Sequence, residues 1–212
     1  MKKLLVVAVG LSSLVLVASP EPWRNGERVP LWPEGKIPNY QEHQRGVMTD
    51  EQWIKGEWYK KDPAFKSEEH RMPYLEWFEK PANPNGICMI LISGGGYGSC
   101  CDTDLIKLWR ETFTKLGCQC VNLVYRTPRP KGLPVWQSGW EDGQRGVRLV
   151  RADAAKRGFD PEKIGAIGMS AGSHLTTLLA TSALTPAYEK VDATDDLPCH
   201  VNWAIANAPA YV

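Results

Sequence analysis

The stretch KIGAIGMSAGSHL, from Lys163 to Leu175, decides the fold of this chain. Its first half, residues 163–168, is a short apolar run that predicts a buried strand, and residues 170–183 carry leucines at helical spacing and predict a helix. Between them lies GMSAG, a GxSxG pattern whose serine, Ser170, falls where the chain turns from strand into helix. This context makes Ser170 a candidate nucleophile.

The residue types around this serine fit a tight turn. Gly168 and Gly172 omit side chains that would collide where the backbone on both sides of the turn packs closely, and Oγ of Ser170 is pushed out above the sheet. The amide of Ala171 points from a helix N-terminus toward any oxygen beside that hydroxyl, which suits a developing negative charge. Ala171 is therefore a predicted oxyanion donor.

A second glycine-rich turn, SGGGYG at residues 93–98, follows the apolar run at residues 87–93. A phosphate cradle would need GxGxxG or GxxxxGK[ST], and the chain has neither, since the residue three beyond Gly96 is Ser99. Acyl-transfer enzymes use such a turn for further oxyanion donors, because its amides must approach the substrate carbonyl unhindered. We expect Gly95 and Gly96 to supply them.

Strand and helix patterns alternate on both sides of these turns, which predicts an α/β fold with a mostly parallel sheet and helices on both faces. A helix following residue 102 should end before Gly117, and another should end near Gly158. The expected strands cover residues 74–78, 87–93, 118–125, 163–168 and 201–206.

The N-terminal third is predicted to lie outside this domain, which spans 73–212. Lys2 and Lys3 precede an apolar run of about 15 residues, which is shorter than a membrane-spanning helix. Residues 1–18 are therefore predicted to be an export signal, and the mature protein is predicted to be periplasmic or secreted. The alternative, an uncleaved anchor, is disfavoured by that length, and no membrane association is expected after cleavage. Residues 19–72 are rich in Pro, Trp and charge without a sustained period, and predict an irregular arm.

Composition excludes some partners. The 25 Lys and Arg against 24 Asp and Glu form no basic stripe, so nucleic acid is not an expected partner. Export permits disulfides among the six cysteines, although their pairing cannot be read from the sequence. Cys118 and Cys120 should share one face of a strand as small buried hydrophobes, and without a CxxC pair or paired histidines no metal site is predicted.

Several segments, in this order, resemble the α/β-hydrolases, and among them the secreted carbohydrate esterases that include acetyl xylan esterases: LWPEGKIPN (31–39), SGGGYG (93–98), YR (125–126), DGQRGVRLVR (142–151) and FDPEKIGAIGMSAGSHL (159–175). The resemblance implies Ser170 as nucleophile and the amides of Gly95, Gly96 and Ala171 as the oxyanion hole. It implies no metal or organic cofactor, and an acylated carbohydrate or other small ester as substrate. The chain departs from the family pattern at Ser93 and Ser173.

The catalytic acid and base are not found among the residues of this chain. His174 would lie along the helix flank and is expected to be structural, as is Arg145, and His200 falls at the opposite end of the sheet from the nucleophile. An acidic loop with Asp192, Asp195 and Asp196 is predicted to be a solvated face. In α/β-hydrolase order the acid and base follow the nucleophile after further strands, so we expect them beyond residue 212, with the last strands and helices of the fold missing here.

Three functions follow from this sequence. The first is a serine esterase that removes acetyl or similar groups from plant polysaccharide through an acyl-enzyme at Ser170. The second is a truncated, catalytically incomplete hydrolase fold. The third is a peptidase or lipase on the same fold, because the fold does not decide the substrate.

Overall fold

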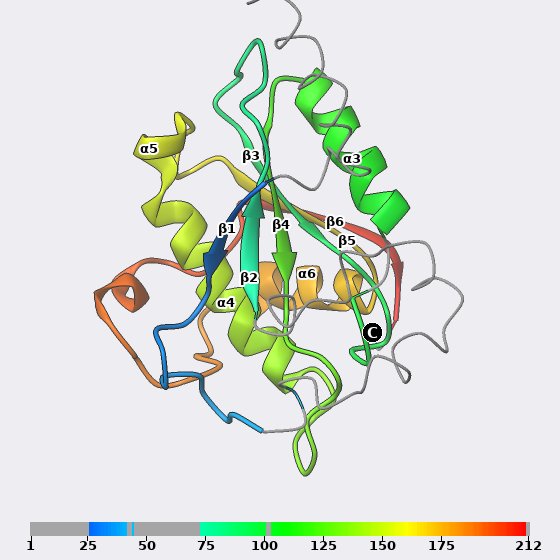
Figure 1. Cartoon of the computed structure of the whole chain (residues 1–212), viewed down its shortest axis with the longest axis vertical. Helices are drawn as coiled ribbons and strands as arrows, with labels where there is room; N and C mark the ends of the chain where they lie inside the picture. The colour runs from blue at the N-terminus through cyan, green and yellow to red at the C-terminus, as the bar shows by residue number, and fades with distance from the viewer. Residues whose placement is uncertain (1–25, 42–43, 45–72, 101–102, 211–212) are drawn as a thin grey trace, which may run out of the picture.

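The computed structural model describes residues 26–41, 44, 73–100 and 103–210 (Figure 1). The predicted export signal and residues 45–72 of the arm lie outside this part. Within it, no helix is long and apolar enough to cross a membrane. The elements are β1 (Glu27–Pro30), β2 (Tyr74–Trp77), β3 (Cys88–Ile92), α3 (Thr103–Lys115), β4 (Gln119–Val124), α4 (Gln137–Ala152), α5 (Ala154–Arg157), β5 (Ile164–Ser170), α6 (Ala171–Thr181), the 3-10 helix η7 (Ala193–Asp196) and β6 (Trp203–Pro209).

The strands form one mixed sheet in the order β1-β2-β4-β3-β5-β6. β4, β3, β5 and β6 run parallel, whereas β1 and β2 are antiparallel to their neighbours. Ile92 of β3 is level with Leu123 of β4 and with Gly168 of β5. The mostly parallel sheet is confirmed, and this register brings the carboxyl ends of β3, β4 and β5 to one edge.

Helices cover both faces of the sheet, as predicted. On one face, Ile106 and Trp109 of α3 pack with Met89 and Cys120 of the sheet. On the other, residues of α4 and α6 pack with Leu75, Leu123 and neighbouring strand residues in the larger core cluster. Figure 1 shows α3 on one side of the strands, and α4 and α5 on the opposite side. β6 is the outermost strand on its side of the sheet, and its residues 204–209 are exposed.

The helix expected to end near Gly158 begins at Gln137, before the apolar residues that predicted it. Glycines at 139, 143 and 146 lower helix propensity there. Their missing side chains leave room for close packing: a Cβ at Gly139 would lie 2.9 Å from the ring of Tyr97, and one at Gly146 would lie 2.8 Å from Leu123. Tertiary contact therefore compensates for weak local preference.

The expectation of an irregular arm is wrong at residues 27–30, which form β1. This strand pairs antiparallel with β2, with Val29 opposite Leu75. The four residues are too short for a sequence period, and Pro30 is tolerated because β1 lies at the edge of the sheet. The arm thus contributes one strand to the domain.

The acidic loop is not simply a solvated face. Arg145 of α4 donates to Asp192 at 2.7 Å and to Asp195 at 3.0 Å, and the side chain of Asp195 is 2% exposed. The Arg145 hydrogen bonds lower the pKa of Asp192 to about 2. The structural pairing role expected for Arg145 is what the geometry shows, and its partners could not be identified from local sequence because they lie 47 and 50 residues away.

A buried charge network attaches the arm to α4. The guanidinium of Arg126, which follows β4, lies 2.6 Å from Glu141 and 3.0 Å from Asp142, and it donates to the carbonyl of Pro38. The indole of Trp32 donates to the same Asp142 carboxylate at 2.7 Å. Burial alone would lower the pKa of Arg126, but the two carboxylates raise it above its usual value, so the side chain stays charged.

The five described cysteines are all buried, and Cys88, Cys118, Cys120 and Cys199 are free thiols. Cys118 and Cys120 pack into the same core cluster, under α3, as the sequence predicted. Burial raises the pKa of Cys120 to about 12 and that of Cys88 well above its usual value. These thiols behave as hydrophobic core residues.

We expect Arg126→Met to lower the free energy of unfolding by about 3 kcal/mol or more, because it leaves the carboxylates of Glu141 and Asp142 buried without their cation. Urea unfolding monitored by tryptophan fluorescence measures the change. Lys156→Met is the matched control, since Lys156 and its partner Glu27 are both largely exposed, and its effect should stay within about 0.5 kcal/mol. Equal effects of the two changes would contradict this role of Arg126.

Candidate active site

Ser170 occupies a strained turn between β5 and α6. Its φ and ψ are 53° and −116°, a conformation that costs a non-glycine residue about 1–3 kcal/mol. A Cβ at Gly168 would lie 2.2 Å from the carbonyl oxygen of Gly172, and one at Gly172 would lie 2.4 Å from the carbonyl oxygens of Ile92 and Ser93. Both glycines are therefore required by close backbone packing, as the sequence predicted.

The amide of Ala171 points toward the β3 side of Ser170. The carbonyl of Ser170 accepts a hydrogen bond from the amide of Ala210, just beyond β6. Because the C=O and N–H of a trans peptide point in opposite directions, the Ala171 N–H points away from β6. It is also in the first turn of α6, where it has no acceptor within the helix. This amide is available to an oxygen beside Ser170.

The glycine turn has a backbone that only glycine accommodates at Gly95. The φ of Gly95 is +117°, and a Cβ there would lie 2.1 Å from the carbonyl oxygen of Ser99. Its carbonyl accepts from the amide of Gly98 at 2.9 Å, so the Gly96 N–H of the same peptide points out of the turn. The carbonyl of Gly96 accepts from Nε of Arg129 at 2.7 Å. The peptides of this turn are thus held in fixed orientations.

The two turns lie at the same edge of the sheet. β3 ends at Ile92, which is level with Gly168 of β5. The glycine turn therefore begins beside the turn between β5 and α6 that carries Ser170, which we call the Ser170 elbow. Gly172 of the elbow packs directly against the carbonyls that end β3. The structure therefore brings the four predicted site residues, Ser170, Ala171, Gly95 and Gly96, to adjacent loops.

Neither described histidine is arranged as a base for Ser170. Nδ1 of His174 lies 2.9 Å from the hydroxyl oxygen of Tyr97 in a hydrogen bond, and burial lowers the pKa of His174. His200 precedes β6, and because β5 and β6 are parallel it lies at the opposite end of the sheet from Ser170. His43 and His70 lie outside the described residues. Both geometries agree with the sequence-based expectation.

An aromatic cluster beside the site was missed from sequence. The ring centroid of Tyr97 lies 5.7 Å from that of Tyr125 and 6.0 Å from that of His174. The His174 ring packs edge-on against Trp136, with a centroid separation of 5.4 Å. The hydroxyl of Tyr125 donates to the carbonyl of Ser93, where β3 ends. The only local signal was a tyrosine directly after three glycines, which alone does not identify a partner.

Other features of the described residues do not add ligands to this site. No group of three or more His, Cys, Asp or Glu side chains in the described part of the chain is placed to hold a metal ion. A hollow of about 730 Å³ lies between residues 36–39 of the arm and residues 186–191, and Ser170 is not among its lining residues. The site is defined by the two turns.

Comparisons with known proteins agree with this geometry. Residues 78–208 match the BD-FAE family. The chain is 37% identical over 93 residues to endo-1,4-beta-xylanase B of Butyrivibrio fibrisolvens, covering 44% of this chain and 14% of that protein. It is 30% identical over 102 residues to an acetylxylan esterase of Xylanibacter ruminicola, covering 48% of this chain and 20% of that protein.

Among solved structures, an acetyl ester-xyloside bifunctional hydrolase from Caldicellulosiruptor lactoaceticus superposes with a TM-score of 0.59 at 24% identity, covering 84% of this chain and 55% of that one. The sheet, the strained serine turn and the glycine turn define an α/β-hydrolase fold. The chain belongs to the BD-FAE family. It spans about half the length of this solved relative and a fifth or less of the two curated ones.

The strain at Ser170 gives a prediction about stability. Ser170→Gly should unfold with a free energy about 1 kcal/mol higher than Ser170→Ala, because glycine relieves the positive φ and alanine keeps the Cβ, while the entropy of glycine in the unfolded chain offsets part of the gain. Both variants lack the hydroxyl, so urea unfolding of the pair isolates the backbone effect. A less stable glycine variant would show that the turn is not strained.

His174 gives a prediction about pH. Its folded pKa is depressed below the usual value of about 6.5, so as pH falls below about 6.5 the unfolded chain takes up a proton before the folded protein does. The stability that neutral His174 contributes is therefore present above this pH and is lost in acid. The difference in free energy of unfolding between wild type and His174→Asn should narrow from pH 7.5 to pH 5. A constant difference would contradict the buried neutral state.

Proposed function

We propose that the whole protein is a serine esterase that hydrolyses carboxylic esters through an acyl-enzyme at Ser170. The observation that carries this proposal is the juxtaposition of the strained Ser170 turn with the glycine turn at one edge of the sheet. The Ala171 and Gly96 amides then face a carbonyl oxygen placed beside the serine hydroxyl. The acetylxylan esterase relative supports the same chemistry.

In the proposed reaction Oγ of Ser170 attacks the acyl carbonyl and gives up its proton to a general base. The carbonyl oxygen becomes an oxyanion, which accepts hydrogen bonds from the amides of Ala171, Gly96 and Gly95. Removing one donor of this kind typically costs about 10²–10³ in kcat. The tetrahedral intermediate collapses, the alcohol leaves with a proton, and water then hydrolyses the acyl-enzyme to release the carboxylic acid and regenerate Ser170.

The base and its acid partner are proposed to come from outside the described residues. Nδ1 of His174 is engaged by Tyr97, and His200 lies at the wrong end of β6. In α/β-hydrolases the acid and the histidine follow the nucleophile in the chain, and we propose the same order here.

The proposed substrate is an acetylated plant polysaccharide or oligosaccharide. The support is that one relative is an acetylxylan esterase and another is a xylanase, which connects both to xylan. The apolar run after Lys2 and Lys3 supports export of the protein to the periplasm or medium, where such polymers occur. The reaction would need no metal or organic cofactor.

The test is hydrolysis of 4-nitrophenyl acetate and acetate release from acetylated xylan by the whole protein. Ser170→Ala should lower kcat about 10³-fold or more, because the nucleophile is lost. Thr181→Ala, at the exposed end of α6, is the control and should retain wild-type rates.

The outcomes separate the alternatives. Turnover of amide or long-chain acyl substrates in preference to acetate would indicate a peptidase or lipase. Absence of any turnover, together with no labelling of Ser170 by a serine-directed phosphonate, would indicate a catalytically incomplete hydrolase fold and would overturn the esterase proposal.

A further inference from the structure

Tyr97 is held in an unfavourable backbone conformation by its side chain. It follows Gly95 and Gly96 in the glycine turn, and its φ of 60° is in the left-handed region that L-residues rarely occupy. Tyr97 is only 1% exposed, and its ring packs against the face of α4 that Gly139 leaves open. A conformation of this kind persists only where the surroundings compensate for its cost.

The hydroxyl of Tyr97 connects the glycine turn to the helix that follows the nucleophile. It forms a hydrogen bond of 2.9 Å with Nδ1 of His174, and His174 lies one helical turn after Ser170 in α6. His174 is 7% exposed, and its imidazole packs edge-on against the rings of Trp136 and Tyr97. Packing therefore holds both partners of the hydrogen bond in place.

This contact joins the two loops that supply the oxyanion donors. The Gly96 amide belongs to the turn that Tyr97 anchors, whereas the Ala171 amide and Ser170 belong to the start of α6, where His174 is rooted. The spacing between the donors and the nucleophile therefore depends on this link as well as on strand pairing. Hydrogen-bond donation is sensitive to such spacing, and a displacement of 1 Å in an active site can cost about 10² in rate.

We propose that Tyr97 and His174 are positioning residues, whose hydrogen bond sets the glycine turn against the Ser170 elbow so that the amides on both loops reach one acyl oxygen. Neither side chain is assigned a contact with the reacting atoms. The inference rests on the proposed esterase function and adds the contact that holds its oxyanion hole together.

A positioning role differs from general support of the fold in the kinetic parameter it changes. The oxyanion is present in the tetrahedral intermediate and the transition states on either side of it but not in the bound substrate, so misplaced donors lower kcat and leave KM almost unchanged. Loss of stability alone reduces the amount of folded enzyme, and the kcat per folded molecule is then unaltered.

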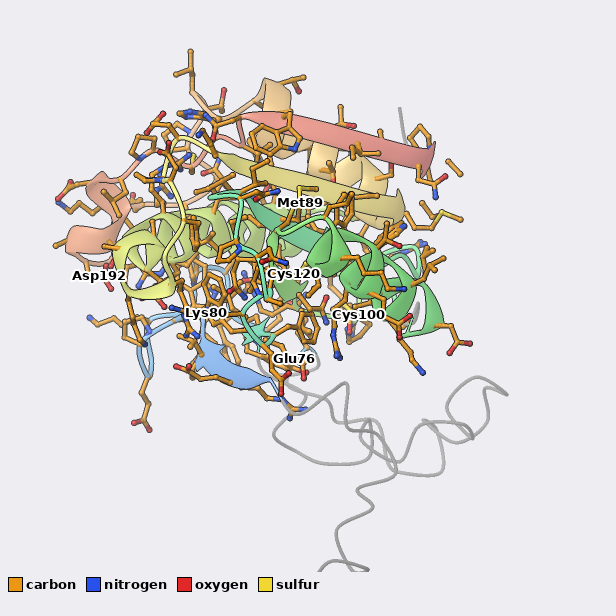
Figure 2. The ribbon with its side chains drawn as sticks, turned by 90° about the horizontal axis from the view of Figure 1, so that it is seen from above. Glu76, Lys80, Met89, Cys100, Cys120 and Asp192 are labelled. Atoms are coloured by element: carbon orange, nitrogen blue, oxygen red, sulfur yellow. The ribbon has the colours of Figure 1, made fainter. Side chains whose placement is uncertain are left out.

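The experiment compares Tyr97→Phe with Tyr188→Phe in the whole protein. Tyr188 is the matched control, because its hydroxyl is also hydrogen-bonded in a part-buried network, with Asp195 at 2.5 Å and Arg148 at 2.6 Å. Arg145 joins Asp195 to Asp192, so Asp192 belongs to the same network. Figure 2 shows Asp192 on the opposite side of the molecule from Cys100, which follows the glycine turn closely in the chain, so this network lies away from that turn. We expect Tyr97→Phe to lower kcat for 4-nitrophenyl acetate about 10-fold or more with KM within twofold, and Tyr188→Phe to leave both within twofold, per mole of folded enzyme.

A second pair of variants tests the partner. The amide of Asn reaches about the position of Nδ1, so His174→Asn should retain most of the wild-type kcat, whereas His174→Leu should lower it as Tyr97→Phe does. In the double variant Tyr97→Phe, His174→Leu, the decrease in kcat should be smaller than the two single-variant decreases combined, because both changes remove the same hydrogen bond.

Each outcome decides between the two proposals. An active wild type in which Tyr97→Phe keeps kcat, or loses it no more than Tyr188→Phe, overturns the positioning role and leaves the esterase function standing. A wild type that neither turns over esters nor labels at Ser170 overturns the esterase function and this inference with it. A loss of kcat confined to Tyr97→Phe and His174→Leu supports the positioning role.

Discussion

The site depends on one close approach, in which the backbone of Gly172 packs against the carbonyl oxygens of Ile92 and Ser93. Parallel pairing of β3 with β5 sets the two strand ends level, and the absent side chain lets the start of α6 reach the end of β3. Any Cβ at this point would separate the Ser170 elbow from the glycine turn. The pairing of β3 with β5 therefore brings the two turns that hold the nucleophile and the donors close together.

Much of this was accessible from sequence because it is locally determined. The glycines at 168 and 172 stand at fixed offsets from Ser170, and strand-like and helix-like periods flank them, so the turn, its neighbours and their order along the chain follow from short-range patterns. The two turns lie at the same edge of the sheet because β3 and β5 are parallel, and parallel strands bring their carboxyl ends together. Prediction succeeded where the constraint acts within about one strand-turn-helix unit.

The features that sequence did not indicate involve partners distant in the chain. The sequence predicts a structural pairing role for Arg145 but a solvated face for Asp192 and Asp195, because charge alone does not distinguish a paired carboxylate from an exposed one. β1 is a strand because it pairs with β2. The glycines of α4 are explained only by the side chains of other elements that pack closely against them. The bond between Tyr97 and His174 spans 77 residues, and neither residue type is diagnostic by itself.

The buried thiols of β3 and β4 have a consequence for chemical reactivity. Disulfide exchange and alkylation proceed through the thiolate, and burial both excludes reagents from Cys88 and Cys120 and keeps their protons in place. Oxidants in the surroundings therefore act on these sulfurs only when the sheet opens, so the rate of their modification reports the lifetime of the folded core. The native fold therefore protects these thiols, and frequent opening of the core would expose them to oxidation and disulfide exchange.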